Sequence, residues 1–284
     1  MAEQTDPLVK ALEARAHSTP LPDAPSLTAE QFLDLAIPGV KGPNDGTPSD
    51  STVNNRYFTP VGYIHLHQFQ TMFGDYGGYP SKMGIVEKFH PFNKLLHEPA
   101  VPKIEAQAVD LGRSHVLLPV AYVLQRKIPA KHKLQYDVEA HVETPEITLP
   151  GVGKQTFDGY VDAIYYIDNK ELVLCEFKRS GCIKLDKWTV PSEGLLGTDA
   201  QKITKQLMKY AYATQRKYFI LSDWNNWLFF HLPDINREQL LVHNRTGNAR
   251  YLEAQGVHCD NASEFKVRVY AFVWNAYEKE YGNP

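Results

Sequence analysis

The sequence predicts an α/β protein in which a mixed central sheet is flanked by helices. Three short segments rich in β-branched and aromatic residues follow one another between residues 134 and 178, which is typical of neighbouring strands. Segments with apolar residues at helical spacing precede and follow them, at 104–127 and 199–216. Helices placed before and after strands in this way pack on the faces of a sheet.

The first strand is predicted over 134–148, where apolar and polar side chains alternate so that one face is buried. The second and third strands are predicted at about 157–167 and 171–178. The pair Asp168-Asn169 lies between them and is typical of a tight turn, so we expect these two strands to form an antiparallel hairpin.

The elements after the hairpin are predicted from similar signals. The helix over 199–216 leads into a strand around 218–221 and another at 227–232, with a turn at Asn225-Asn226 between them. A closing helix is predicted over 263–281, because its apolar residues recur at helical spacing.

The N-terminal part of the chain divides into short helices and a loop. Asp6-Pro7 predicts the start of one short helix, and Thr28 with Gln31 predicts a capped second one. Residues 38–55 are rich in Gly, Pro, Asn, Asp and Ser and have no apolar periodicity, which indicates a linker.

We therefore place a domain boundary near residue 55. Residues 1–55 form an N-terminal helical and flexible segment, and residues 56–284 form the principal domain. Within that domain, 57–99 is dense in Tyr, Phe, Gly and His and is interpreted as a lid or as an arm packed on the core.

Composition excludes some classes of protein. The formal net charge of −3 over 284 residues excludes a generally basic nucleic-acid binder, so any phosphate affinity has to come from a local patch. No apolar run reaches the roughly 18 residues of a membrane span. The N-terminus lacks the pattern of a secretion signal, and the three cysteines lack zinc spacing. We expect an intracellular protein, cytoplasmic or nuclear, with reduced thiols and no membrane partner.

The most informative feature is a pair of carboxylates near a lysine. Strand alternation places Leu172, Leu174, Glu176 and Lys178 on one face of the third strand. The antiparallel neighbour brings Asp162 beside Glu176. Two oxygen ligands on adjacent strands suit Mg²⁺ or Mn²⁺ better than nitrogen-rich or thiolate sites do.

These residues resemble the PD-(D/E)xK nuclease superfamily, and further motifs are similar to its RecB-like branch. Gly159-Tyr-Val-Asp162 and Glu176-Phe-Lys178 match the acidic motifs, and Gln206-Leu-Met-Lys-Tyr210 resembles the Gln-x-x-x-Tyr motif. Gly112-Arg-Ser-His115 resembles an upstream Gly-x-x-His. The resemblance covers about residues 104–232 and implies a restriction-endonuclease-like core.

The sequence departs from the family pattern at three points. Gly159 stands where the family name has proline, and Glu176 stands where many RecB-like members have aspartate. Pro119 interrupts the helix expected after Gly112, and this makes the placement of His115 near the metal the least certain of these assignments.

The resemblance implies a metal-dependent deoxyribonuclease that leaves a 5′-phosphate. Asp162, Glu176 and the backbone carbonyl of Phe177 would hold Mg²⁺ or Mn²⁺, with His115 as a further ligand. Lys178 would stabilise the developing hydroxide or the phosphate.

The helix over 199–216 supplies two further site residues. Gln206 and Tyr210 are four residues apart and lie on one side of this helix, where they would support the site.

Basic residues around this site are candidates for contact with the DNA backbone, although such runs also occur on plain solvated faces. These residues are Arg179, Lys184, Lys202, Lys205 and Lys209.

Two alternatives stay open. The chain is either an active exo- or endonuclease on single- or double-stranded DNA, or an inactive nuclease-fold module that binds nucleic acid or serves in assembly. A different α/β hydrolase or transferase is disfavoured, because the sequence has no Gly-x-Ser-x-Gly elbow, phosphate loop or dinucleotide fingerprint. The oligomeric state is left undetermined.

Overall fold

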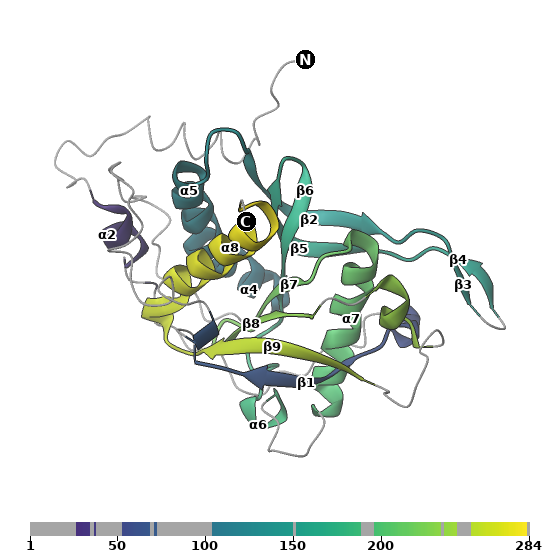
Figure 1. Cartoon of the computed structure of the whole chain (residues 1–284). Helices are drawn as coiled ribbons and strands as arrows, with labels where there is room; N and C mark the ends of the chain where they lie inside the picture. Colours follow the sequence, from purple (N-terminus) through teal and green to yellow (C-terminus); the bar gives the residue numbers. More distant parts are fainter. Residues whose placement is uncertain are drawn as a thin grey trace.

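A seven-stranded mixed sheet lies at the centre of the computed structural model (Figure 1). The structure describes residues 27–34, 37, 53–68, 71–72, 104–149, 152–188, 196–233, 236–242 and 251–282. The strands, in spatial order, are β1 (Val61–Leu66), β9 (Leu252–Cys259), β8 (Trp227–His231), β7 (Tyr218–Ser222), β6 (Lys170–Phe177), β5 (Asp158–Ile167) and β2 (Leu134–Glu143). The pairs β6–β7 and β1–β9 are parallel and the others antiparallel, so the predicted α/β class with a mixed sheet is confirmed.

Helices cover both faces of this sheet (Figure 1). One face carries α4 (Glu105–Gly112), the π-helical turn η4 (Arg113–Leu117), α5 (Leu118–Lys127) and α8 (Phe265–Tyr281), with the short α2 (Ala29–Leu33) packed against α5. The other face carries α7 (Thr198–Thr214). The other short helices in the described residues are η1 (Val53–Tyr57), α6 (Leu185–Trp188), η5 (Arg237–Leu240) and η7 (Ala262–Glu264). Two apolar clusters, one on each face, make the core.

The predicted hairpin is present as β5 and β6. Asp168 and Asn169 have φ of 52° and 62°, and Ile167 pairs with Lys170, so the turn has two residues with positive φ. Asn and Asp tolerate this conformation better than other side chains do, which explains why the local sequence was informative.

One detail of the third strand was predicted wrongly. Tyr165 pairs with Val173 whereas Tyr166 pairs with Glu171, so Leu172 is an extra residue in β6. Because of this bulge, Leu172 packs with the α5 and α8 side of the core, whereas Leu174 packs with the α7 side. Leu172 therefore does not share a face with Leu174.

The first predicted strand is also shorter than expected. It ends at Glu143, and Ile147–Leu149 (β3) pairs instead with Gly153–Gln155 (β4) in a separate hairpin that extends beyond the main sheet (Figure 1). Pro145 lies between the two segments and has no N–H for a strand ladder, which explains the break.

The helical prediction over 104–127 is confirmed, but its interruption lies earlier than Pro119. The five residues of η4 form a π-helical turn, in which the Leu118 N–H donates to the Arg113 carbonyl five residues back. Pro119 follows directly at the start of α5, so its missing N–H removes one bond from a helix that continues without a break. The predicted capping box of α2 is present, since Gln31 N–H donates to Thr28 Oγ1 at 3.2 Å and Thr28 N–H donates to Gln31 Oε1 at 2.9 Å.

Besides β4, two strands of the main sheet were not predicted. Residues 61–66, within the segment interpreted as a lid or arm, form edge strand β1, and 252–259 form its parallel partner β9. The helix expected at Asp6-Pro7 lies outside the described residues, as does most of 38–55 and 73–99. None of the helices in the described ranges is long and apolar enough to span a bilayer.

Candidate active site

The candidate site forms where β5 and β6 separate. The ladder between these strands runs only as far as the pair of Ala163 and Cys175. Beyond it, the Phe177 N–H donates to the Asp162 carboxylate at 2.6 Å instead of to a backbone carbonyl. Glu176 and Phe177 continue to pair with β7, so β6 stays in the sheet. This divergence gives Asp162 the space to lie beside the end of β6 with its carboxylate directed toward that strand.

Glu176 and Lys178 form a buried ion pair at the end of β6. The Lys178 Nζ lies 2.6 Å from Glu176 Oε1, and the two residues are 3 % and 2 % exposed. The same ammonium lies 3.2 Å from Oε1 of Glu105, at the first turn of α4. Buried charges are stable only when they are paired in this way. Glu105 was not predicted from the sequence, because a single glutamate at a helix start belongs to no recognisable pattern.

Gln206 reaches the same carboxylate from α7, and Tyr210 lies on the same side of the helix and contacts Gln206, as their spacing predicted. Gln206 Nε2 donates to Glu176 Oε1 at 2.8 Å and to the Tyr210 hydroxyl at 2.7 Å. The Tyr210 hydroxyl in turn donates to the Tyr160 carbonyl on β5 at 2.8 Å. This chain of hydrogen bonds fixes the orientation of the Glu176 carboxylate relative to both α7 and β5.

Burial changes the titration of these groups. Burial, followed by the charge of Glu176, raises the pKa of Asp162 well above its ordinary value. Burial also raises the pKa of Glu176, and Lys178 opposes that rise. Burial works to lower the pKa of Lys178, but the carboxylates of Glu176, Glu105 and Asp162 outweigh it and raise this pKa above its ordinary value. Lys178 is therefore positively charged at neutral pH.

The donor set fits a small divalent cation. Glu176 Oε2 is buried and has no hydrogen-bond partner in the described part of the chain, whereas Oε1 accepts from Lys178 and Gln206. A cation would satisfy that oxygen and offset the repulsion that raises the pKa of Asp162. Within the described ranges, no three His, Cys, Asp or Glu side chains are grouped to hold a metal. Two carboxylates in this arrangement suit Mg²⁺ or Mn²⁺, because Mg²⁺ is usually held by one or two carboxylates and several waters.

His115 is not brought together with the two carboxylates. It lies on η4, and its ring is 6.5 Å from that of Trp224, centroid to centroid. Burial and the charge of Lys266 lower the pKa of His115. His115 is itself buried, and these interactions place it beside Trp224 and near Lys266 of α8. Its assignment as a metal ligand stays a prediction that the geometry does not support.

The basic residues predicted to contact DNA differ in exposure. Lys184 and Lys202 are exposed, and Lys202 lies 3.9 Å from Asp199. Arg179 and Lys205 are partly buried. Lys209 is 4 % exposed, and its Nζ donates to the Asp158 carbonyl at 2.9 Å. Lys209 is thus a buried donor beside the site and does not belong to a solvated face, whereas its contact with DNA stays a prediction.

Asp223, which sequence reasoning missed, anchors the loop after Lys178. It is fully buried, and its Oδ2 accepts from the N–H groups of Gly181 at 3.0 Å and Ile183 at 2.8 Å. Its Oδ1 accepts from the Asn226 N–H at 2.8 Å. Burial raises the pKa of Asp223 to about 6, although these hydrogen bonds oppose the rise. The loop that leads away from Lys178 is thus held by one carboxylate from the β7–β8 turn.

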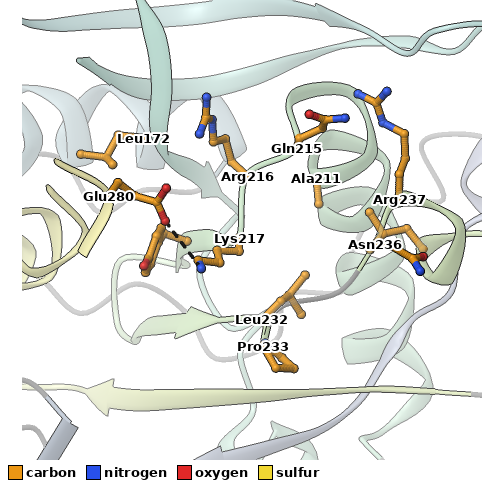
Figure 2. Close-up of a pocket in the computed structure, with 12 residues that line it drawn as sticks. Leu172, Ala211, Gln215, Arg216, Lys217, Leu232, Pro233, Asn236, Arg237 and Glu280 are labelled. Atoms are coloured by element: carbon orange, nitrogen blue, oxygen red, sulfur yellow. Dashed lines mark ion pairs between the residues drawn. The ribbon is translucent and has the colours of Figure 1, made fainter. Parts of the chain in front are cut away.

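A pocket of about 440 Å³ lies elsewhere, at the opposite end of β6 (Figure 2). Its basic side chains already have partners. Figure 2 shows Lys217 paired with Glu280, at 3.6 Å. Arg237 Nε donates to the Tyr212 carbonyl at 2.9 Å, near the C-terminus of α7. These contacts indicate that the basic side chains of the pocket stabilise the fold and are not part of the candidate site.

Comparisons with protein-family models, curated proteins and solved structures find no match to this chain.

Proposed function

We propose that this protein is a divalent-metal-dependent nuclease that hydrolyses phosphodiester bonds in DNA. The observation that carries the proposal is the state of the Glu176 carboxylate. It is buried, one oxygen accepts from Lys178 and Gln206, and the other has no partner in the described structure. The nearby Asp162 is destabilised as an anion, as its raised pKa indicates. A buried carboxylate with one free oxygen, next to a partly buried second carboxylate, is the arrangement that a cation would complete.

The order of the elements supports a restriction-endonuclease-like core. The chain runs from α4 through β2, β5 and β6 to α7 and β7. In this order Asp162 lies on the second core strand, Glu176 at the end of the third, and Gln206 and Tyr210 on the helix that follows. The separate hairpin of β3 and β4 is an insertion between the first two core strands.

Each side chain has a definite role under this proposal. Asp162, Glu176 and the Phe177 carbonyl would hold Mg²⁺ or Mn²⁺. When bound there, the ion would lower the pKa of a water molecule and offset negative charge on the phosphate. Lys178 keeps a buried positive charge next to the carboxylates, where an anionic phosphate oxygen would be stabilised. Gln206 holds the orientation of Glu176.

The first test is cleavage of four substrates: closed circular and linear DNA, each single- and double-stranded, with Mg²⁺, Mn²⁺ or EDTA. We expect metal-dependent cleavage of at least one of them, and cutting of closed circles would show an endonuclease. DNA binding without cleavage in Mn²⁺ would instead favour the inactive module.

Variants separate the roles within the site. Glu176→Gln is expected to lose both cleavage and Mn²⁺ binding, measured by titration calorimetry. Lys178→Gln keeps a hydrogen-bond donor but no charge, so it is expected to lose cleavage and retain Mn²⁺ binding. Glu171→Gln is the matched control, because Glu171 lies on the same strand, is partly exposed and pairs with Arg216 at the far end. Unchanged Mn²⁺ affinity in Glu176→Gln would contradict the proposal.

A further inference from the structure

The first half of β5 has one edge that β6 does not cover. β5 pairs with β2 over nearly its whole length, but with β6 only from Ala163 to Ile167. Carbonyls two residues apart in a strand point to the same side. The carbonyls of Asp158 and Tyr160 therefore face one side together, and a buried carbonyl without a partner would be costly.

Two consecutive residues of α7 supply the donors that a neighbouring strand would otherwise provide. Lys209 Nζ donates to the Asp158 carbonyl at 2.9 Å, and the Tyr210 hydroxyl donates to the Tyr160 carbonyl at 2.8 Å. Lys209 is 4 % exposed, and Tyr210 is also buried. The Lys209 ammonium also lies over the Tyr210 ring, 5.2 Å from its centroid, so the two side chains form one packed unit.

Gly159 lies between the two carbonyls, where an added side chain would force the Lys209 ammonium to move. A Cβ on Gly159 would be 2.7 Å from Lys209 Nζ and 3.2 Å from Tyr210 Cε1. Gly159 does not have a positive φ, so glycine is favoured here by the close approach of Lys209 and Tyr210 and not by backbone conformation. The glycine of the Gly159-Tyr-Val-Asp162 segment thus has a direct structural reason, which is the close approach of α7.

We propose that Lys209 is a positioning residue for the candidate active site. Together with Tyr210 it holds residues 158–160 of β5 against α7, and so fixes Asp162, two residues further along the strand. The same helix holds Glu176 through Gln206 at 2.8 Å. One rigid helix therefore sets both carboxylates relative to each other. This inference rests on the proposed function for its catalytic meaning, but its structural part does not.

The alternative role for Lys209, a contact with the DNA backbone, gives different results. A phosphate contact acts on DNA affinity and on its salt dependence. A positioning role acts on the metal site, where loss of a supporting hydrogen bond typically weakens metal binding by about 10- to 100-fold.

The decisive comparison is Lys209→Met against Lys202→Met, an exposed lysine on the same helix. For Lys209→Met we expect Mn²⁺ affinity at least about 10-fold weaker by calorimetry, a lower kcat and a nearly unchanged KM for DNA. Lys202→Met is expected to leave Mn²⁺ affinity unchanged. Unchanged Mn²⁺ affinity in Lys209→Met, with a raised KM and a smaller salt dependence, would overturn the inference. Tyr210→Phe removes only the hydroxyl and is expected to weaken Mn²⁺ binding in the same way, which keeps the test open where Lys209→Met does not fold.

A second measurement needs neither metal nor DNA. Methionine ends one atom short of the Lys209 Nζ, so Gly159→Ala is expected to lower the melting temperature less in the Lys209→Met background than in the wild type. Additive effects of the two changes would refute the packing of Lys209 on Gly159. A wild-type protein that neither binds Mn²⁺ nor cleaves DNA would refute the proposed function, and this cycle would still decide whether Lys209 holds β5.

Discussion

Replacing Gly112 by alanine tests how closely α4 approaches the site. A Cβ at this position would lie 2.0 Å from Cε1 and 2.3 Å from Cζ of Phe177. Carbon atoms pack at about 3.5–4.0 Å, so helix or ring must move by about 1.5 Å. The Phe177 ring is fully buried and packs edge-on against Trp227, with the centroids 5.6 Å apart, so a movement of the ring would disturb this contact.

The expected loss of stability follows from two opposing terms. Overpacking of this kind costs about 1–3 kcal/mol. Alanine recovers up to about 1 kcal/mol relative to glycine inside a helix. A contact about 1.5 Å too short belongs in the upper half of the overpacking range, about 2–3 kcal/mol. The net destabilisation is therefore about 1–2 kcal/mol, which corresponds to a melting temperature lower by about 2–8 °C for a chain of this size. Because the Phe177 N–H donates to Asp162 and α4 carries Glu105, we also expect weaker Mn²⁺ binding.

Scanning calorimetry of four proteins checks this reasoning. They are the wild type, Gly112→Ala, Phe177→Leu and the double variant. Leucine lacks the ring atoms that collide, so Phe177→Leu is expected to destabilise less in the alanine background than in the wild type. A Gly112→Ala protein as stable as the wild type would refute the contact, and additivity of the two changes would do the same.

Three other perturbations have definite expected outcomes. The folded pKa of Asp223 is raised from 3.8 to about 6, so the folded state binds the proton more tightly than the unfolded chain. Its contribution to stability is fully present below about pH 4 and falls by up to about 3 kcal/mol as the pH rises to about 6. Asp223→Asn should therefore flatten the pH dependence of chemical denaturation over this range, and equal slopes in both proteins would contradict the assignment. Asp162→Asn removes an anion that burial and Glu176 disfavour, so it should melt higher than the wild type in EDTA. It should also lose the stabilisation by Mn²⁺, which for the wild type is expected to be about 2.7 kcal/mol at an Mn²⁺ concentration 100 times the dissociation constant. A melting temperature of Asp162→Asn below that of the wild type in EDTA would contradict this explanation. Thr28→Ala removes the cap of α2 and should cost about 0.5–2 kcal/mol, whereas Thr28→Ser should retain most of the stability, so equal losses in both would exclude the cap.

Local patterns predicted the elements that carry most of the candidate site. The Asp168-Asn169 turn fixed the hairpin, and the hairpin brought Asp162 to the end of β6. The four-residue spacing of Gln206 and Tyr210 put both side chains on the side of α7 that faces the sheet. In each case the deciding interaction joins residues close in sequence, or follows from the period of a regular element.

Such patterns did not predict contacts between residues that are far apart in the sequence. Glu105 meets Lys178 across 73 residues, and β1 pairs with β9 across about 190 residues. The sequence did not distinguish Lys209 from the other lysines of α7. Periodicity shows which side of a helix faces the sheet, but not whether the edge of a strand lies close enough to bury a lysine next to that side. The prediction for His115 rested on motif similarity, and the π-helical turn that carries it was not predicted.

The two carboxylate oxygens of Glu176 have different surroundings in the candidate site. Oε1 accepts from both Lys178 and Gln206, so its capacity is used by groups that belong to the protein. Oε2 has no such partner among the described residues and is the atom left for an ion. Because Lys178 already neutralises part of the charge, Glu176 can stay ionised in a buried position, and its anion remains available to a cation. The lysine thus makes a buried carboxylate tolerable in the folded chain and supplies positive charge next to the place where a phosphate would bind.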